Sequence, residues 1–236
     1  MANLYGPRIV TDGLIFHVDA ANKKSYPGTG TTWYDLSGKQ QNVTLENGPA
    51  YSSLNYGKFS FDGTNDGGLI ASNSEMLSIV CPMTILVWAK QTSTGSYRVI
   101  FGQYSSTTNH RLIKMLRVDG SSRIFKYYYG TSSGSFGSRQ HSVYPTLNQW
   151  NFYSVIVSGT ISSAYITLGL NTTFTGASSA GALTSTPDTS TAVRIGRMNS
   201  AEYWAGDISV VSVYNKALST NEVTNIYNAN KGRFGL

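Results

Sequence analysis

Short runs of alternating apolar and polar residues recur along the chain. In residues 58–63, Phe59 and Phe61 alternate with polar neighbours, so both side chains point to one face of a strand. Residues 83–90 form the most apolar run and predict the clearest strand. Similar runs predict further strands at 13–19, 43–45, 97–104, 112–118, 123–129, 151–157, 163–171, 193–196 and 205–214.

Turn residues separate the predicted strands. Asp119 and Gly120 predict a hairpin between residues 112–118 and 123–129. Residues 130–140 and 172–191 are small and polar, which predicts two exposed loops.

A single helix is expected, close to the C-terminus. Ser219 and Glu222 have the spacing of a capping box, and Val223, Ile226 and Tyr227 form an apolar stripe behind it. A helix this short is not stable alone, so its stripe should pack on the strands. Many short strands without an alternation of strands and helices predict an all-β fold, an antiparallel sandwich with one short C-terminal helix.

The composition of the 236 residues favours one domain. Hydrophobic residues make up 40% of the chain, enough for a sizeable core, and charged residues only 13%. The single cysteine, Cys81, excludes an internal disulfide and lies in an apolar run, which favours a small buried side chain. We expect an N-terminal arm over residues 1–12 and the sandwich over residues 13–236.

Charge and hydropathy limit the cellular environments and the classes of partner that the sequence allows. Residues 1–11 lack the apolar segment of a secretory signal, and no stretch approaches ~18 consecutive apolar residues. We therefore expect synthesis in a cytoplasm and no membrane partner. The net charge of +6 is too mild for a dedicated nucleic-acid binder; it fits either ordinary solubility or an anionic partner such as an acidic glycan.

A set of motifs follows in order along the chain. They lie at 13–20 (GLIFHVDA), 33–38 (WYDLSG), 59–66 (FSFDGTND), 83–88 (MTILVW), 149–153 (QWNFY), 193–196 (VRIG) and 206–223. The ordered set resembles the concanavalin A-like lectin/glucanase superfamily, in particular its laminin G-like, or pentraxin-like, branch. This resemblance implies two curved antiparallel sheets in a jelly roll.

The segment 227–235 (YNANKGRFG) narrows the resemblance to laminin G-like domains in structural proteins of tailed phages. That implies a non-enzymatic structural or adhesive protein of the virion, on the exterior of the capsid or tail. Its partners would be other virion proteins, further copies of itself, or a host-surface glycan. The alternatives are a free carbohydrate-binding module and, disfavoured by the residues below, a glycoside hydrolase.

The sequence lacks the carboxylate pattern of the superfamily's enzymes. If the resemblance extended to the enzymes of the superfamily, it would imply a strand with a Glu-x-Asp-x-Glu type run. The alternation of side chains in such a strand places a pair of carboxylates on one face, as glycoside hydrolysis needs. Here the glutamates are far apart in the sequence: Glu46, Glu75, Glu202 and Glu222. The histidines share no metal spacing: His17, His110 and His141. We therefore expect no enzymatic activity.

Calcium is a candidate cofactor, because the resemblance implies that related domains bind it through carboxylates and carbonyls at the rim. The candidate ligands are the aspartates of the matched motifs: Asp19, Asp62, Asp66 and Asp207. Calcium takes about six to eight oxygen ligands. The alternative is ordinary hydrogen bonding at turns and strand ends, and Asp62 and Asp66 lie in one turn.

A glycan site needs exposed aromatic faces beside amide or hydroxyl groups. The candidates are Tyr97, Tyr104, Tyr128, Tyr144, Tyr203 and Trp204. Among them Tyr203 and Trp204 are favoured because they follow a polar loop. Trp33, Trp88 and Trp150 are better explained as core residues.

The predicted hairpin carries the densest basic region of the chain. Its residues are Arg111, Lys114, Arg117, Arg123 and Lys126. They form either a solvated strand face or a contact to an acidic partner.

Both chain ends are candidates for attachment to a partner. The tail 231–236 carries Phe234 and Leu236 beside Arg233, an arrangement typical of interface anchors. The arm over residues 1–12 carries several apolar side chains and could add a strand to a neighbour's sheet. The alternative is that both ends fold back on their own sandwich.

Overall fold

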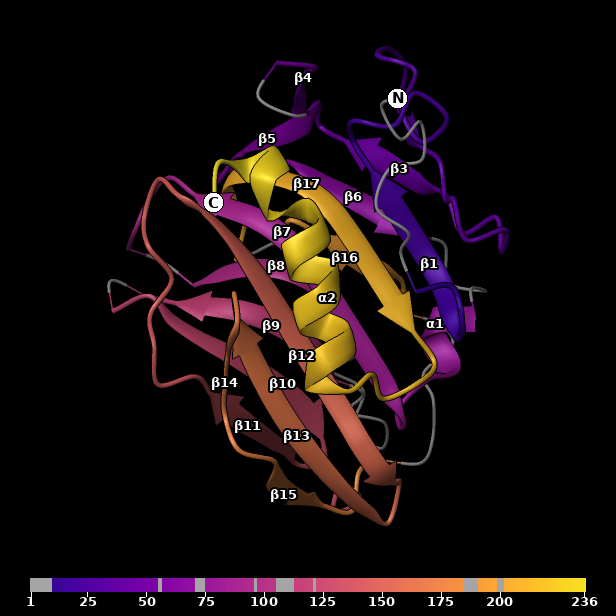
Figure 1. The fold of residues 1–236 in the computed structure, drawn as a ribbon, viewed down its shortest axis with the longest axis vertical. Helices are drawn as coiled ribbons and strands as arrows, with labels where there is room; N and C mark the ends of the chain where they lie inside the picture. The colour runs from indigo at the N-terminus through magenta and orange to yellow at the C-terminus, as the bar shows by residue number, and fades with distance from the viewer. Residues whose placement is uncertain are drawn as a thin grey trace.

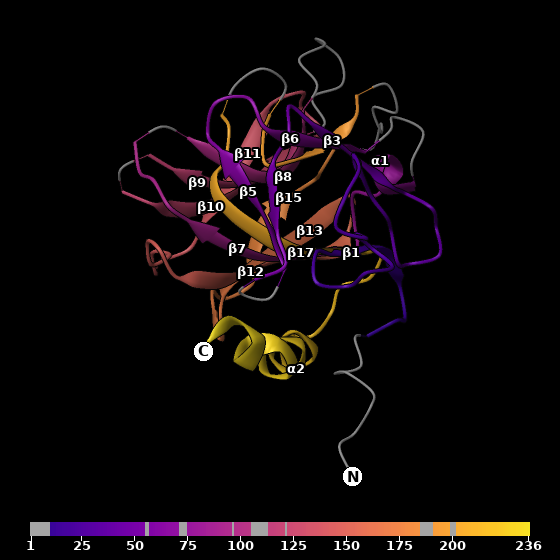
Figure 2. The ribbon, with the colours of Figure 1, turned by 90° about the horizontal axis from the view of Figure 1, so that it is seen from above.

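The structure, a computed structural model, describes residues 10–54, 57–70, 75–95, 97–104, 113–120, 122–184, 191–198 and 202–236. They form two antiparallel sheets packed face to face, with a helix on the outer side of one sheet (Figures 1 and 2). The predicted all-β jelly-roll sandwich with one short C-terminal helix is confirmed.

Sheet A lies next to the helix and runs in the order β14-β13-β12-β7-β17-β5-β4. Its strands are β4 (Ala50–Ser52), β5 (Lys58–Asp62), β7 (Met83–Gln91), β12 (Trp150–Thr160), β13 (Ser163–Leu170), β14 (Thr173–Phe174) and β17 (Ala205–Tyr214). Two further strands join this sheet: β1 (Leu14–Asp19) pairs with β17, and β15 (Ser178–Gly181) pairs with β13.

Sheet B forms the other layer and runs in the order β11-β10-β9-β8-β16-β6-β3-β2. Its strands are β2 (Thr32–Trp33), β3 (Val43–Glu46), β6 (Gly67–Ile70), β8 (Arg98–Tyr104), β9 (Ile113–Asp119), β10 (Ile124–Gly130), β11 (Phe136–Gln140) and β16 (Val193–Ile195). The predicted hairpin is confirmed, because β9 and β10 pair directly around Gly120.

The two predicted loops are wrong in part, since each contains strands. Residues 130–140 include β11, which pairs with β10, and the described part of 172–191 includes β14 and β15, which pair with β13. These strands lack an apolar stripe because most of their residues are exposed or half-buried beside the rest of their sheets. Main-chain hydrogen bonds hold them, and a hydrophobic pattern does not report those bonds.

The predicted helix is α2 (Thr220–Asn230), which continues into the 3-10 turn η1 (Lys231–Phe234). The capping box is confirmed: Ser219 Oγ accepts from the Glu222 amide at 3.2 Å, and Glu222 Oε2 accepts from the Ser219 amide at 2.7 Å. A one-turn helix, α1 (Glu75–Ser78), was not predicted. In the part of the chain that the structure describes, no helix is long and apolar enough to cross a membrane.

The central strands of sheet A are buried on both faces. In β7, Ile85 and Val87 point into the main core between the sheets, whereas Leu86 and Trp88 point to a second apolar cluster under α2. Strands β12 and β17 divide their side chains in the same way, which explains why these segments form continuous apolar runs. The predicted core tryptophans Trp33, Trp88 and Trp150 are all buried.

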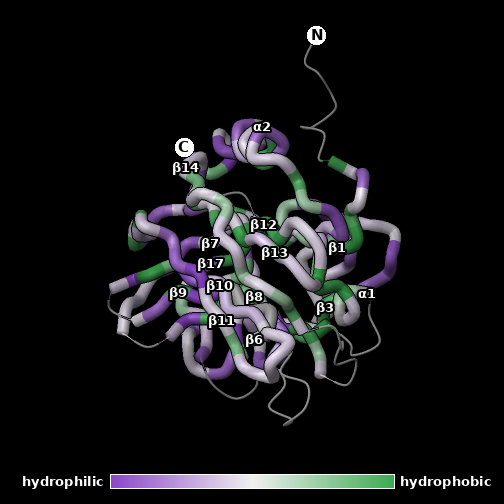
Figure 3. Tube along the Cα trace, turned by 90° about the horizontal axis from the view of Figure 1, so that it is seen from below, coloured by the Kyte–Doolittle hydropathy of each residue, from purple (hydrophilic) through white to green (hydrophobic). Residues whose placement is uncertain are grey.

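The C-terminal tail completes the second cluster. Phe234 is only 5% exposed, and its ring stacks on Trp88 with centroids 4.1 Å apart. In Figure 3, α2 carries both hydrophilic and hydrophobic residues, as an amphipathic helix on a sheet should. The prediction that Phe234 anchors a partner is therefore wrong, and the alternative, a tail folded on its own sandwich, holds.

The N-terminal arm is described only from residue 10 onward, so most of that prediction lies outside the described residues. Val10 packs against the second cluster, and Asp12 pairs with Lys216 at 2.8 Å. The described end of the arm thus contacts its own domain.

Gly206 of β17 is paired with both β5 and β7, and the β7 main chain lies too close to it for a side chain. Its φ is +144°, and a Cβ there would clash with the Lys90 carbonyl oxygen and lie 3.0 Å from the Gln91 Cα. We expect Gly206→Ala to lower the free energy of unfolding by about 2–4 kcal/mol, measured by urea denaturation. Gly38→Ala is the matched control: φ there is +86°, no described atom lies within 4 Å of its Cβ, and the expected loss is about 1 kcal/mol. Equal losses in the two variants would show that the close approach is not the cause.

Candidate functional site

A charged and aromatic cluster lies on the outer face of sheet B. Phe125 and Tyr127 of β10 and Val118 of β9 point into the main core, so their neighbours along each strand point outward. Arg117 and Lys126 lie directly opposite each other in the β9–β10 ladder. The Arg117 cluster consists of Tyr97, Arg117, Asp119, Lys126, Tyr128 and Glu202.

The Arg117 guanidinium lies at the centre of this cluster and is held on several sides. Nε donates to Asp119, Nη1 donates to Glu202 Oε1 at 2.9 Å, and Nη2 donates to the Tyr128 hydroxyl at 2.6 Å. The rings of Tyr97 and Tyr128 lie 4.2 Å and 4.3 Å from the guanidinium carbon, within the range of cation–π contacts. These contacts fix the position of the arginine.

Asp119 connects the two basic residues of the cluster. It accepts from Lys126 Nζ at 2.9 Å and from the Tyr128 hydroxyl at 3.0 Å, in addition to Arg117. Burial alone would raise the pKa of Asp119, but the hydrogen bonds from Arg117 and Lys126 outweigh it, so the pKa lies below its ordinary value. The bond to Asp119 raises the pKa of Lys126. Asp119 is therefore ionised near neutral pH, and the two basic side chains of the cluster, Arg117 and Lys126, face the two acidic ones, Asp119 and Glu202.

Exposed aromatic rings border the cluster. The Tyr97 side of the cluster is open, since this residue is 51% exposed. On the other side Phe136 of β11 is 54% exposed, and its ring centroid lies 6.2 Å from that of Tyr128. The surface thus combines apolar ring faces with fixed hydrogen-bonding groups, which suits a ligand that has both flat apolar faces and hydroxyl groups.

Only some of the predicted glycan-site residues lie together: Tyr97 and Tyr128 both contact Arg117, and Tyr104 packs against the same small apolar cluster as Tyr128. Tyr128 belongs to the Arg117 cluster, and Tyr144 is exposed in the segment after β11. Tyr203 is half-buried, and its carbonyl oxygen accepts from Arg98 Nη1 at 2.8 Å. Trp204 is 0% exposed and packs in the main core, so the prediction of a ligand contact there is wrong. It directly precedes β17, whose residues are all buried.

The predicted basic patch differs from the observed surface. Arg117 and Lys126 lie together but are neutralised by Asp119 and Glu202. Arg123 lies in the turn between β9 and β10, and its Nη1 donates to the Pro145 carbonyl at 3.2 Å. The other two predicted members, Arg111 and the side chain of Lys114, lie outside the described residues. A bare basic patch for an acidic partner is therefore not found in the described part of the hairpin.

The four aspartates predicted as calcium ligands do not form one site. Asp62 makes the expected Asx turn, accepting from the Thr64 amide at 2.7 Å, and Asp66 accepts from the Asp62 amide at 2.9 Å. Asp207 is held by Lys58 at 2.7 Å and Lys90 at 2.8 Å. Across the described ranges, no three His, Cys, Asp or Glu side chains are arranged to hold a metal ion.

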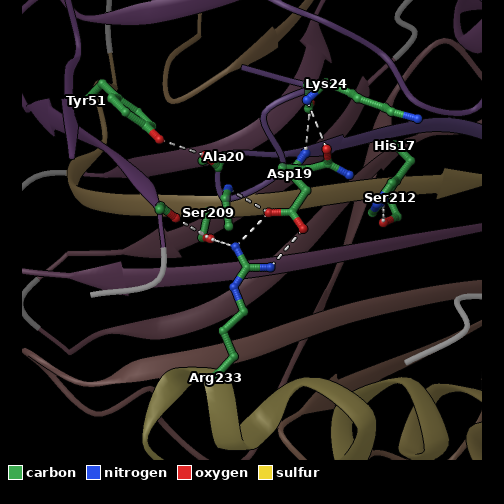
Figure 4. A network of polar contacts seen from close by, with 12 residues as sticks. His17, Asp19, Ala20, Lys24, Tyr51, Ser209, Ser212 and Arg233 are labelled. Atoms are coloured by element: carbon green, nitrogen blue, oxygen red, sulfur yellow. Dashed lines mark hydrogen bonds and ion pairs between the residues drawn. The ribbon is translucent and has the colours of Figure 1, made fainter. Parts of the chain in front are cut away.

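The fourth aspartate, Asp19, binds the C-terminal turn. Arg233 of η1 reaches across to β1, with Nη1 2.8 Å from Asp19 Oδ2 and Nη2 2.6 Å from Oδ1 (Figure 4). The same Nη2 lies 2.9 Å from Ser209 Oγ of β17. This bidentate ion pair holds η1 on sheet A, so Asp19 has a structural role.

Two acidic members of the site, Asp119 and Glu202, are not among the binding residues predicted from the sequence. Asp119 is predicted in the turn after the strand 112–118, whereas β9 extends to Asp119, which lies two residues after Arg117 and so shares its face. Glu202 has no local signal in the sequence: it lies 85 residues from Arg117 and adopts a left-handed conformation with φ of +57°. The Val99 amide of β8 donates to the Glu202 carbonyl oxygen at 3.0 Å, and this long-range contact brings Glu202 to the cluster.

Comparison with known proteins supports the fold. Residues 62–224 match the family described as the concanavalin A-like lectin/glucanases superfamily. No curated protein matches the sequence.

Solved structures of clostridial binding domains resemble the fold at low identity. The botulinum neurotoxin serotype D binding domain superposes with a TM-score of 0.69 at 13% identity, over 93% of this chain and 52% of that one. Its ligand-binding domain in complex with N-acetylneuraminic acid gives 0.67 at 14%, over 93% and 51%. The binding domain of Paraclostridial Mosquitocidal Protein 1 gives 0.69 at 15%, over 93% and 52%. The chain thus spans about half the length of these structures.

The charge balance of the Arg117 cluster predicts how acid affects stability. The pKa of Asp119 is lowered in the folded state, so its contribution is present above its ordinary value of 3.8 and is lost as the pH falls below it. At neutral pH we expect Asp119→Asn to lower the free energy of unfolding by about 2–4 kcal/mol, because Arg117 and Lys126 lose their shared carboxylate. Urea denaturation from about pH 7 to pH 3 should show this difference shrinking toward the acid end. A difference that stays constant with pH would contradict this account of the cluster.

Proposed function

Because the chain belongs to the concanavalin A-like lectin/glucanase superfamily, we propose that it is a non-enzymatic glycan-binding domain whose ligand lies on the Arg117 cluster. The observation that carries the proposal is the pair of exposed rings, Tyr97 and Phe136, on either side of a fixed hydrogen-bonding network on the outer face of sheet B. A sugar ring has apolar C–H faces and a rim of hydroxyl groups, so it matches both parts of this surface.

The positions of the polar groups favour hydroxyl contacts. The carboxylates of Asp119 and Glu202 accept hydrogen bonds, whereas Lys126 and Arg117 donate them. Since the charges of the cluster cancel, a ligand needs no net charge to bind. The Arg117 contacts hold these groups in place before any ligand arrives, which limits the entropy lost on binding.

A catalytic role fits the cluster less well, although it holds two carboxylates. Glycoside hydrolysis needs a carboxylic acid whose pKa is raised, so that it can donate a proton to the leaving oxygen. Arg117 contacts both Asp119 and Glu202, and the pKa of Asp119 is lowered. An arginine between two carboxylates stabilises their ionised forms.

The similar structures are compatible with a binding role. They are binding domains by name, and one of them is in complex with N-acetylneuraminic acid. Their low identity means that they support the sandwich as a carrier of glycan sites and do not identify the ligand of this chain.

Removing one exposed ring tests the proposal. We expect the protein to bind a subset of a glycan array, and Tyr97→Ala to weaken the strongest interaction about tenfold by isothermal titration calorimetry, because a ring contact to the sugar is lost. Tyr165→Ala is the matched control, since Tyr165 is 43% exposed but lies on β13 of sheet A. We expect this control to bind like the wild type.

Each of three outcomes would contradict a different part of the proposal. No saturable binding to any glycan, host lipopolysaccharide included, would overturn the glycan proposal. Equal binding by Tyr97→Ala and the wild type would show that the glycan lies elsewhere on the domain. Release of reducing sugar from a polysaccharide, abolished by Asp119→Asn, would replace the binding role with a catalytic one.

The biological setting is a separate proposal, supported by the resemblance of residues 227–235 and the other motifs to tailed-phage domains. In that setting the domain is an adhesive or structural component on the exterior of the virion, beside capsid or tail proteins or further copies of itself. We expect it to copurify with intact particles at a fixed stoichiometry, measured by quantitative mass spectrometry. Particles that lack it after gradient purification would remove this setting and leave the glycan-binding proposal untouched.

A further inference from the structure

A cavity of about 420 Å³ lies between α2 and the outer face of sheet A. It is on the opposite side of the sandwich from the Arg117 cluster, since α2 covers sheet A and the cluster lies on sheet B (Figure 2). Leu86, Phe152 and Val210 line it from the sheet, and Ile226 lines it from the helix. Small-molecule sites commonly have volumes of about 300–1,000 Å³ and mostly apolar walls.

One end of the cavity is polar and is formed by β1 and β17. His17 of β1 is only 7% exposed, and its Nδ1 lies 2.8 Å from Ser212 Oγ (Figure 4). Among the described residues no hydrogen-bond partner reaches the other ring nitrogen, Nε2. Nε2 is not one of the buried side-chain atoms that lack a partner, so it is open to the cavity, where a hydroxyl group of a ligand can take the place of water.

The polar end carries no unbalanced charge. Arg233 and Asp19, which also line the cavity, form a two-pronged ion pair with each other. Burial lowers the pKa of His17 and outweighs the opposite effect of Asp19 and Asp35, so its ring is neutral at neutral pH. A charged ligand would lose its hydration and find no free counter-charge.

We propose that this cavity binds a small uncharged amphiphile, a molecule with an apolar body and one hydroxyl group. The apolar body contacts Leu86, Phe152 and Ile226, and the hydroxyl group hydrogen-bonds to His17 Nε2. Both a neutral imidazole nitrogen and a hydroxyl group can serve as donor or acceptor, so the pair fits either tautomer. The rim residues Asn22 and Ala229 are exposed, so the ligand can enter without displacement of α2.

Titration of the full chain with 1-octanol tests the site by isothermal titration calorimetry. We expect saturable binding of one molecule per chain. His17→Phe keeps a ring of similar shape but removes Nε2, so we expect the affinity to fall about tenfold, the value of one hydrogen bond. Octanoate, with the same chain length and a negative charge, should bind at least about tenfold more weakly than 1-octanol.

Two variants of the helix α2 test the cavity independently if His17→Phe disturbs folding. Ala229→Trp places a large side chain at the rim, and we expect it to abolish binding of 1-octanol. Asn225→Trp is the matched control, because Asn225 is exposed on the same helix and does not line the cavity; we expect it to bind like the wild type. Heat that never saturates, or binding that Ala229→Trp leaves unchanged, would overturn the proposal. Octanoate binding as tightly as 1-octanol would overturn the uncharged ligand class.

Discussion

The structure depends on the burial of sheet A from both sides. Strands β7, β12 and β17 present apolar side chains to sheet B and also to α2. A sheet face of this kind cannot be left in water, since burial of apolar area is the main stabilising term in folding. The short helix and the turn η1 provide the cover, and the stacking of Phe234 on Trp88 fastens it. The C-terminus is therefore part of the core.

This arrangement leaves the two outer faces of the sandwich with different chemistry. Sheet A is covered, and the space that the narrow helix leaves uncovered beside β1 forms the cavity at His17. Among the described residues no helix covers β9 and β10 of sheet B, and their described outward positions include the charged or aromatic residues Arg117, Asp119, Lys126 and Tyr128. The alternation of side chains along each strand explains the difference between the two outer faces. Successive side chains point to opposite faces of a sheet, so a covered face carries apolar residues and an exposed face can carry charged ones.

The sequence predicted those features that local patterns encode. The strand runs, the capping box at Ser219 and the core tryptophans all follow from neighbours within a few residues, and the structure confirms them. The loops predicted at the edge strands β11 and β14 are wrong, because main-chain pairing leaves no hydrophobic signature in exposed strands. The prediction of a surface ring at Trp204 is wrong, because the polar loop before it gives no local indication that its side chain points inward. The pairing of Arg233 with Asp19 joins residues 214 apart and depends on the whole fold.

The Arg117 cluster is not explained by stability alone. A group of ionised side chains that are nearly buried loses much of its hydration, and apolar side chains of similar size often stabilise a fold as well or better. Elsewhere the same sandwich uses apolar side chains wherever it needs cover, as under α2. At Arg117 it instead holds a guanidinium between two carboxylates, with an exposed tyrosine against it. Side chains fixed in this way add little to the stability of the sheet. They do reduce the conformational entropy that is lost when a partner with hydroxyl groups and flat apolar faces binds. The physical argument for a binding surface on sheet B therefore comes from this contrast between the two faces, since the fold alone is compatible with many functions.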